Sequence, residues 1–447
     1  MSAHLVDIKP FARRGVCPAL SAPMQTGDGL LSRVAFTDGM SPEDLQNLCA
    51  LAALHGNGLL DITARGGVQF RGLTVKSANA LEVDVLALGL PLRQGLAVET
   101  SPLAGLDDTT IADTRAIVSR ISDAAAALNL HERLAAKMSV IVDGGGHVQM
   151  LDLLADIRLK AIDGDFWQLM LGGAEAKALK AGVLRAGDAA AIVIELLVHL
   201  AEKGPNARGR DLDLETVCGI CGDRLIERNV DVPTTAAVPY GFMRLTDDLS
   251  AAALAPAFGQ ISAEALSALC RKASALGIIS VRPGPAHGLF FVGREGACEA
   301  LLSHAQQAGF VIGADDPRSS IAVCAGEPAC ASAFIPTRDL ANHAAVEFAA
   351  LLDGSLTLHL SGCGKGCAHP TSSLLAFSGT AEGLAFTFSG RVSDIPDVIL
   401  PFAEQKAALS RLARLYEKEH KPGENARTLL DRLGRQKIVA ALRQDDR

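Results

Sequence analysis

The chain has 447 residues, of which 49% are hydrophobic and 21% charged, and its formal net charge is −8. This length allows roughly two or three domains with buried cores. The acidic balance excludes the basic surface that nucleic-acid binding needs. The N-terminus lacks the apolar run of a signal peptide, and the most apolar predicted helix, 189–201, is short and contains Glu195 and His199. We therefore expect no membrane span, a cytoplasmic location and a reducing environment for the ten cysteines.

In chain order, a segment rich in glycine and proline, 15–33, precedes a helix pattern at 41–56 that returns at 262–277. Five positions correspond at one constant offset: Ser41, Leu45, Leu48, Cys49 and Gly56 match Ser262, Leu266, Leu269, Cys270 and Gly277. The serines stand where a helix is capped and the glycines where it ends. Each helix precedes a strand pattern that ends in arginine, at Arg65 and Arg282. The chain thus contains one internal duplication.

The segments after each repeat also run in parallel. The predicted helices and strands are helix 108–128, strands 137–142 and 165–171 and helix 188–203, then helix 337–352, strands 355–360, 374–377 and 384–388 and helix 401–419. These elements predict an α+β fold of two pseudo-repeated halves, each an α+β sheet with helices on one face. The predicted domains are 15–80, 81–235, 236–300 and 315–400, with a helical tail at 401–447 that we expect to be peripheral beyond Lys421. The boundary between the halves is placed at 234–240.

Four cysteines of the second half come in two close pairs, Cys324 with Cys330 and Cys363 with Cys367. Glycines flank the second pair, where the backbone must turn sharply. Two pairs on facing loops can supply the four thiolates of a [4Fe–4S] cluster. A zinc site, a disulfide pair and buried structural cysteines are the alternatives. The gap of five residues in the first pair differs from the spacing of about two to four in zinc ribbons, so the pattern favours the cluster.

Several basic residues of the first half lie at or just past predicted strand ends: Arg33, Arg65, Arg71, Lys137, Arg158 and Lys160. Basic residues of this kind usually lie on the solvent-exposed surface and have no specific role. Arg65 differs because it ends an apolar strand and is followed by G-G-V-Q-F-R, a tight turn. Arginine binds carboxylates through two parallel hydrogen bonds, so a cluster of arginines suits a polycarboxylate ligand. We take Arg33, Arg65, Arg71 and Lys137 as candidate ligand-binding residues.

Other candidates carry weaker signals. Cys218 and Cys221 form a C-x-x-C that is either redox active, half of a metal site or structural, and no second pair lies nearby in the sequence. Cys49 and Cys270 are expected to be packing residues of the repeated helices. His369 lies two residues beyond the last thiol and is a candidate catalytic residue or metal ligand, although a lone histidine more often bonds to backbone.

The thiol spacing, the segments I-T-A-R-G-G-V-Q-F-R-G and S-P-L-A-G-L-D, and the duplication together resemble the nitrite and sulfite reductase superfamily. The resemblance implies that each half combines a ferredoxin-like module with a larger nitrite/sulfite reductase-type module. It also implies that the four thiols hold a [4Fe–4S] cluster, and that Arg65 and Lys137 match basic residues lining the tetrapyrrole and substrate site. The second active-site lysine of the reductases falls at Ser139 here.

The segments R-G-V-C-P-A-L-S-A-P-M-Q-T-G-D-G-L-L-S-R and S-G-C-G-K-G-C-A-H-P look instead like the precorrin-3B synthase family, a divergent branch acting in aerobic cobalamin biosynthesis. That resemblance implies a monooxygenase that uses dioxygen to hydroxylate a meso carbon of precorrin-3A while an acetate closes a γ-lactone. It also implies a mononuclear non-haem iron and an external reductant, either a donor protein or NADH. The alternatives are a siroheme-dependent nitrite or sulfite reductase and a non-catalytic iron–sulfur carrier or sensor.

Overall fold

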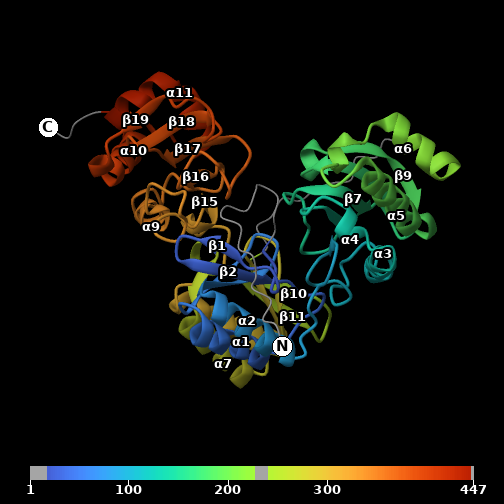
Figure 1. Ribbon diagram of the computed structural model, residues 1–447. Coiled ribbons are helices and arrows are strands. Elements are labelled where there is room, and N and C mark those ends of the chain that lie inside the picture. The colour runs from blue at the N-terminus through green and yellow to red at the C-terminus, as the bar shows by residue number, and fades with distance from the viewer. Residues whose placement is uncertain (1–17, 227–239, 444–447) are drawn as a thin grey trace. The chain divides into compact units, whose positions relative to one another are not determined.

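The computed structural model describes residues 18–226 and 240–443. These residues form α+β structure around four sheets, as Figure 1 shows. The chain divides into two compact units, the first mainly Leu31–Leu254 with Ile261–Ala308 and the second mainly Gly309–Arg447. The boundary expected at 234–240 lies outside the described residues except for Tyr240. Among the described helices, none is both long and apolar enough to cross a bilayer.

Two modules of the first unit share one order of elements, β-β-α-β-β-α. The first module consists of β1 (Met24–Thr26), β2 (Gly29–Val34), α1 (Pro42–His55), β3 (Leu59–Ile62), β4 (Val68–Leu73) and α2 (Val75–Ala87). The second module consists of β10 (Gly241–Arg244), β11 (Ser250–Leu254), α7 (Ala263–Leu276), β13 (Ser280–Pro283), β14 (Leu289–Gly293) and α8 (Glu295–Gln307). The strand orders are β1-β2-β4-β3, extended by β12 (Gln260–Ser262) beside β3, and β10-β11-β14-β13. The matching orders confirm the predicted duplication.

Helices α1 and α7 begin and end where the repeat predicted. Ser41 accepts a hydrogen bond from the Asp44 backbone N–H, and the Asp44 carboxylate accepts from the Ser41 backbone in return. Ser262 caps α7, and Gly277 ends it in the left-handed region that favours glycine. The two helices pack against each other. Cys49 and Cys270 are buried packing residues as expected, and burial raises the pKa of the Cys49 thiol to about 12.

The two larger modules share one sheet topology. Their strands are β5 (Ala97–Glu99), β6 (Ser139–Asp143), β7 (Ala155–Ala161), β8 (Phe166–Gly173) and β9 (Leu179–Arg185), and β15 (Ile321–Val323), β16 (Leu358–Ser361), β17 (Ser373–Gly379), β18 (Leu384–Gly390) and β19 (Val398–Leu400). In each sheet the strands lie side by side in chain order. The first three strands pair in parallel, and the fourth pairs antiparallel with both the third and the fifth. The duplication therefore extends to the larger modules.

Helices cover one face of each sheet. The first sheet is accompanied by α3 (Arg115–Ala127), α4 (Leu130–Arg133), α5 (Ala186–Lys203) and α6 (Leu214–Cys221), and the second by α9 (Thr337–Glu347), α10 (Gln405–Glu419) and α11 (Ala426–Arg443). Alternate strand residues such as Leu358 and Leu360 enter the apolar core beneath these helices. The opposite faces carry the polar residues described below.

Two sequence expectations were wrong. The helix predicted at 108–128 begins only at Arg115, because Asp107 and Thr109 form a hydrogen-bonded turn. The tail expected to be peripheral beyond Lys421 contains α11, whose Leu429, Leu430 and Leu442 are completely buried in the core of the second unit. Its charged residues occupy the solvent side, so composition concealed an amphipathic helix.

Candidate functional site

The four paired cysteines lie on two loops of the second unit. Cys324 directly follows β15, and Cys363 follows β16, with Cys330 and Cys367 farther along the same loops. Because β15 and β16 are parallel neighbours, paired from Ile321 with Leu358 to Val323 with Leu360, both loops leave one edge of the sheet. The loops are in contact, since the backbone N–H of Gly362 donates a hydrogen bond to Cys324 Sγ at 3.0 Å.

Further contacts hold the two thiol loops in place. Thr337 is the first residue of α9, and its hydroxyl donates to the Cys324 carbonyl at 2.8 Å. Lys365 Nζ bonds to Ser332 Oγ at 2.7 Å and so joins one loop to the other. A Cβ at Gly362 would lie 2.6 Å from Ala333 Cβ, so only glycine permits this close approach.

The four thiols lie close enough to influence one another. The pKa of Cys367 is raised first by desolvation of its thiol within the loop and then by the thiols of Cys363, Cys324 and Cys330, while Lys365 lowers it. In the described residues, no group of three or more His, Cys, Asp or Glu is arranged to hold a single metal ion. A four-iron cluster keeps its thiolates farther apart than one ion does, because each thiolate binds a different iron. The soft donor set and the N–H bond to sulfur fit such a cluster.

Two histidines adjoin the thiol loops. The rings of His359 and His369 meet edge to face with centroids 5.5 Å apart. His359 lies on β16 and is 0% exposed. Burial, followed by the charge of His369, lowers the pKa of His359 to about 4, so its ring is neutral near pH 7. His369 is half-buried, and its Nε2 lies 3.0 Å from Thr371 Oγ1.

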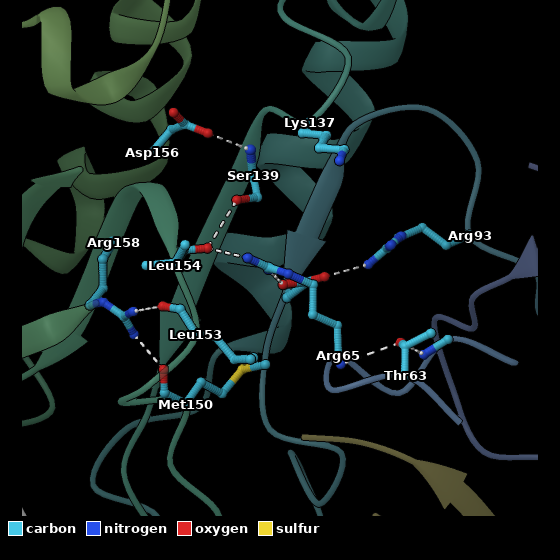
Figure 2. A network of polar contacts seen from close by, with 12 residues as sticks. Thr63, Arg65, Arg93, Lys137, Ser139, Met150, Leu153, Leu154, Asp156 and Arg158 are labelled. Carbon is cyan, nitrogen blue, oxygen red and sulfur yellow. Dashed lines mark hydrogen bonds and ion pairs between the residues drawn. The ribbon is translucent and has the colours of Figure 1, made fainter. Parts of the chain in front are cut away.

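In the first unit, a buried carboxylate joins two arginines. Glu99, at the end of β5, accepts hydrogen bonds from the guanidinium groups of Arg65 and of Arg93, the latter at 3.2 Å. Arg65 also donates to the Leu154 carbonyl (Figure 2). The Glu99 side chain is 4% exposed, whereas those of Arg65 and Arg93 are 34% and 25% exposed. One carboxylate shared by two guanidinium groups leaves a net positive charge that is accessible to a ligand.

The position of Arg65 differs slightly from the prediction. Strand β3 ends at Ile62, and Arg65 lies in the turn before β4. Its backbone N–H donates to Thr63 Oγ1 at 3.3 Å, and Gly66 follows with φ +78°. The turn itself, rather than a strand end, therefore directs the side chain.

The other predicted basic residues divide by burial. Lys137 is exposed two residues before β6 (Figure 2). Arg33 is half-buried on β2 and lies against the amide of Gln69, whose oxygen, turned toward it, accepts from Nε at 2.8 Å. Arg71 is buried on β4, and its Nη1 lies 2.9 Å from Asp61 Oδ2. Lys137 is thus the most accessible of the three.

Arg158 and Lys160 on β7 are almost completely buried. Arg158 donates to the carbonyls of Met150 at 2.9 Å and Leu153 at 2.6 Å, which holds the loop before β7. Lys160 forms an ion pair with Glu175 at 2.6 Å. Burial lowers the pKa of Arg158, as does the charge of Arg65, while Asp143 and Glu175 raise it. Both side chains stabilise the sheet face on which the Arg65 network lies.

Comparison with known proteins identifies the family. Residues 22–87 match the family described as the Nitrite/Sulfite reductase ferredoxin-like half domain. A curated precorrin-3B synthase from Sinorhizobium sp is 38% identical over 437 residues, which cover 97% of this chain and 95% of that protein. The chain belongs to the precorrin-3B synthase family. The structure of Mycobacterium tuberculosis NirA protein, 17% identical, aligns over 92% of this chain and 84% of its own with a TM-score of 0.67, so this family member shares that fold.

Sequence reasoning about this precorrin-3B synthase family member missed Arg93, Glu99 and His359. Glu99 is the last residue of a three-residue strand too short to recognise, and Arg93 lies four residues before that strand. His359 looks like one more residue of an apolar strand. The C-x-x-C of this chain lies on α6, where Cys218 is exposed and burial raises the pKa of Cys221 to about 11. A raised thiol pKa disfavours the reactive thiolate, which favours the structural interpretation of that pair.

Proposed function

We propose that this chain converts precorrin-3A to precorrin-3B. The near full-length identity of 38% with a precorrin-3B synthase carries the proposal. In the reaction, one oxygen atom of dioxygen becomes a hydroxyl group on the macrocycle, and an adjacent acetate closes the γ-lactone. Two electrons and two protons from an external reductant, either a donor protein or NADH, release the second oxygen atom as water. The product is therefore heavier than the substrate by one oxygen atom.

The substrate's acetate and propionate arms would bind to the basic residues of the first unit. Arg65 and Arg93 share Glu99, so their group keeps one net positive charge, and both side chains are accessible. Guanidinium groups bind carboxylates through two parallel hydrogen bonds, which orients as well as attracts the macrocycle. Lys137 adds an exposed ammonium group. Arg33 stays in the proposed set, while the buried Arg71 would act through its pairing with Asp61.

The thiols of the second unit would hold a [4Fe–4S] cluster through Cys324, Cys330, Cys363 and Cys367. The contact between the two loops, the mutual influence of the thiols and the N–H bond to Cys324 Sγ support this assignment. When bound, such a cluster supplies single electrons. For a separate mononuclear iron, the described residues offer no set of three or more His, Cys, Asp or Glu, so the proposal gives such an iron no role.

The test is incubation of anaerobically purified protein with precorrin-3A, a reductant and ¹⁸O₂, followed by mass measurement of the product. We expect a gain of one labelled oxygen atom, with Cys367→Ala losing both the iron and the turnover. Cys218→Ala, which removes an exposed thiol of the first unit, is the matched control and should keep both. Turnover that incorporates no label would refute the proposal. A tetrapyrrole absorption that survives desalting, with nitrite or sulfite reduction, would favour a siroheme enzyme instead.

A further inference from the structure

His359 is a buried imidazole whose two ring nitrogens have no hydrogen-bond partner among the described residues. It lies within β16 and is 0% exposed. A neutral imidazole carries one N–H donor and one acceptor nitrogen. Leaving such groups unsatisfied in a protein interior costs as much as a lost hydrogen bond, so buried polar side chains nearly always have partners. The position therefore calls for a bonding partner that the protein atoms do not supply.

The ring lies beneath the loop that carries two of the thiols. Leu358 and Leu360 enter the apolar core, so His359 between them points to the opposite face of the sheet. A Cβ built on Gly366 would lie 3.7 Å from His359 Cε1. Gly366 directly precedes Cys367, and its φ of +62° shapes the turn between Cys363 and Cys367. The imidazole is thus adjacent to the second thiol pair.

The two residues that pair directly with His359 on the neighbouring strands have no polar side chain. In register, it lies between Ala322 of β15 and Ala376 of β17. In the corresponding row of the other larger module, Ile141 lies between Glu99 and Arg158. In the first sheet the middle strand thus carries an apolar residue between two charged ones, and in the second sheet it carries a polar residue between two apolar ones. The methyl side chains of these alanines cannot form a hydrogen bond with the imidazole.

We propose that His359 donates its ring N–H to a sulfur atom of the iron–sulfur cluster and thereby raises the cluster's reduction potential. The inference rests on the proposed function, because it requires a cluster at Cys363 and Cys367. Thiolate and sulfide sulfur accept such bonds, and hydrogen bonds to sulfur tune the potential of these clusters. The bond strengthens on reduction, since the reduced cluster carries more negative charge. A metal ion bound by His359 and His369 alone would have only two protein ligands, fewer than the three or four usual for zinc or iron.

The test compares His359→Leu, which removes the N–H, with His359→Gln, which keeps a donor. Anaerobic redox titration followed by electron paramagnetic resonance measures the potential, and iron and sulfide analysis measures loading. We expect the Leu variant to show about a tenfold lower equilibrium constant for one-electron reduction, equivalent to about 59 mV. The Gln variant should recover much of this loss. His343→Leu is the matched control, because His343 lies on α9 and bonds to the Lys406 carbonyl.

The outcomes separate the two proposals. A wild-type protein without iron and sulfide would refute the cluster itself, and with it the proposed function's redox part. A fully loaded Leu variant with an unchanged potential would overturn only the role of His359. Loss of the cluster from the Leu variant but not from the Gln variant would support the hydrogen bond, whereas loss from both would make His359 a packing residue. The Leu variant could instead keep the cluster at an unchanged potential and lose one separate iron. His359 would then be a ligand of that iron, which would also overturn the inference.

Discussion

At the scale of single residues, the arginines that we propose to bind the ligand differ in charge balance from the buried Arg71. Arg71 has its own carboxylate in Asp61, and both side chains are buried. Arg65 and Arg93 share the single carboxylate of Glu99, and each keeps a quarter or more of its side chain exposed. Glu99 therefore fixes the two guanidinium groups without neutralising both. Such a group attracts an anionic ligand more strongly than the Arg71–Asp61 pair, whose two charges balance.

Replacing Arg93 with glutamine should weaken tetrapyrrole binding. The substitution leaves Arg65 alone with Glu99, so the net charge of the group falls from +1 to zero, and one charge-assisted hydrogen bond of about 1.5–3 kcal/mol is lost. We expect affinity for a uroporphyrin-type ligand to fall at least about tenfold. Fluorescence titration at two salt concentrations measures this. Arg210→Gln, at a side chain 77% exposed, is the control. Equal affinities in both variants would exclude Arg93 from the site.

Asp107 gives a residue-scale prediction about pH. Burial raises its pKa, but hydrogen bonds from Thr109 and His147 outweigh burial and lower the pKa below its usual value. A carboxyl with a depressed folded pKa adds stability above its unfolded pKa and loses it as pH falls through the folded value. Asp107→Asn should therefore lower stability at pH 7, and its difference from wild type should shrink below about pH 4. Denaturant unfolding at both pH values tests this, with the exposed Asp248→Asn as control.

At the scale of elements, local signals predicted the long helices and the thiol loops but not the short strands. The cap of α1 and the thiol spacing are readable within a few residues. Strand β7 was also missed, although it is seven residues long and its Asp156, Arg158 and Lys160 alternate with apolar residues as in a half-buried strand. The sequence did not show that all three polar side chains are buried. Their partners lie on other loops of the fold, as does the Glu99 that joins Arg65 to Arg93. Contacts between distant segments leave no local pattern in a sequence.

The turn that carries Arg65 makes a prediction at this scale. Gly66 and Gly58 both have positive φ, at +78° and +76°, so alanine at either should cost about 1–2 kcal/mol of stability. A Cβ at Gly66 would also lie 2.6 Å from the backbone nitrogen of Gly284, in the corresponding turn of the repeat, whereas at Gly58 it would meet nothing within 4 Å. Gly66→Ala should therefore destabilise more and also weaken ligand binding by displacing Arg65. Equal losses in both variants would argue against this close packing.

At the scale of the whole molecule, duplication lets one sheet topology carry two different sets of polar side chains. Both larger modules have a loop after their second strand. In each, the side chain of the last strand residue forms a hydrogen bond with the backbone of the residue two positions later. Asp143 accepts from the Gly145 backbone at 2.9 Å, and Ser361 donates to the Cys363 carbonyl at 2.7 Å. The first loop continues with glycines and His147, and the second with the thiols. The two sheets thus share one strand order, while the residues of their loops and of their facing strand positions differ.

The C-terminal helix is part of that frame for the thiol loops. Leu429, Leu430, Ile438 and Leu442 of α11 are completely buried with α10 and the β15–β19 sheet. Deleting residues 422–447 would expose this core, since each buried leucine contributes about 2–5 kcal/mol when truncated to alanine. We expect the truncated protein to lose its iron and to unfold in the second unit. A chain lacking only 444–447 is the control and should keep both. Full iron content after the longer deletion would show that the thiol loops do not depend on α11.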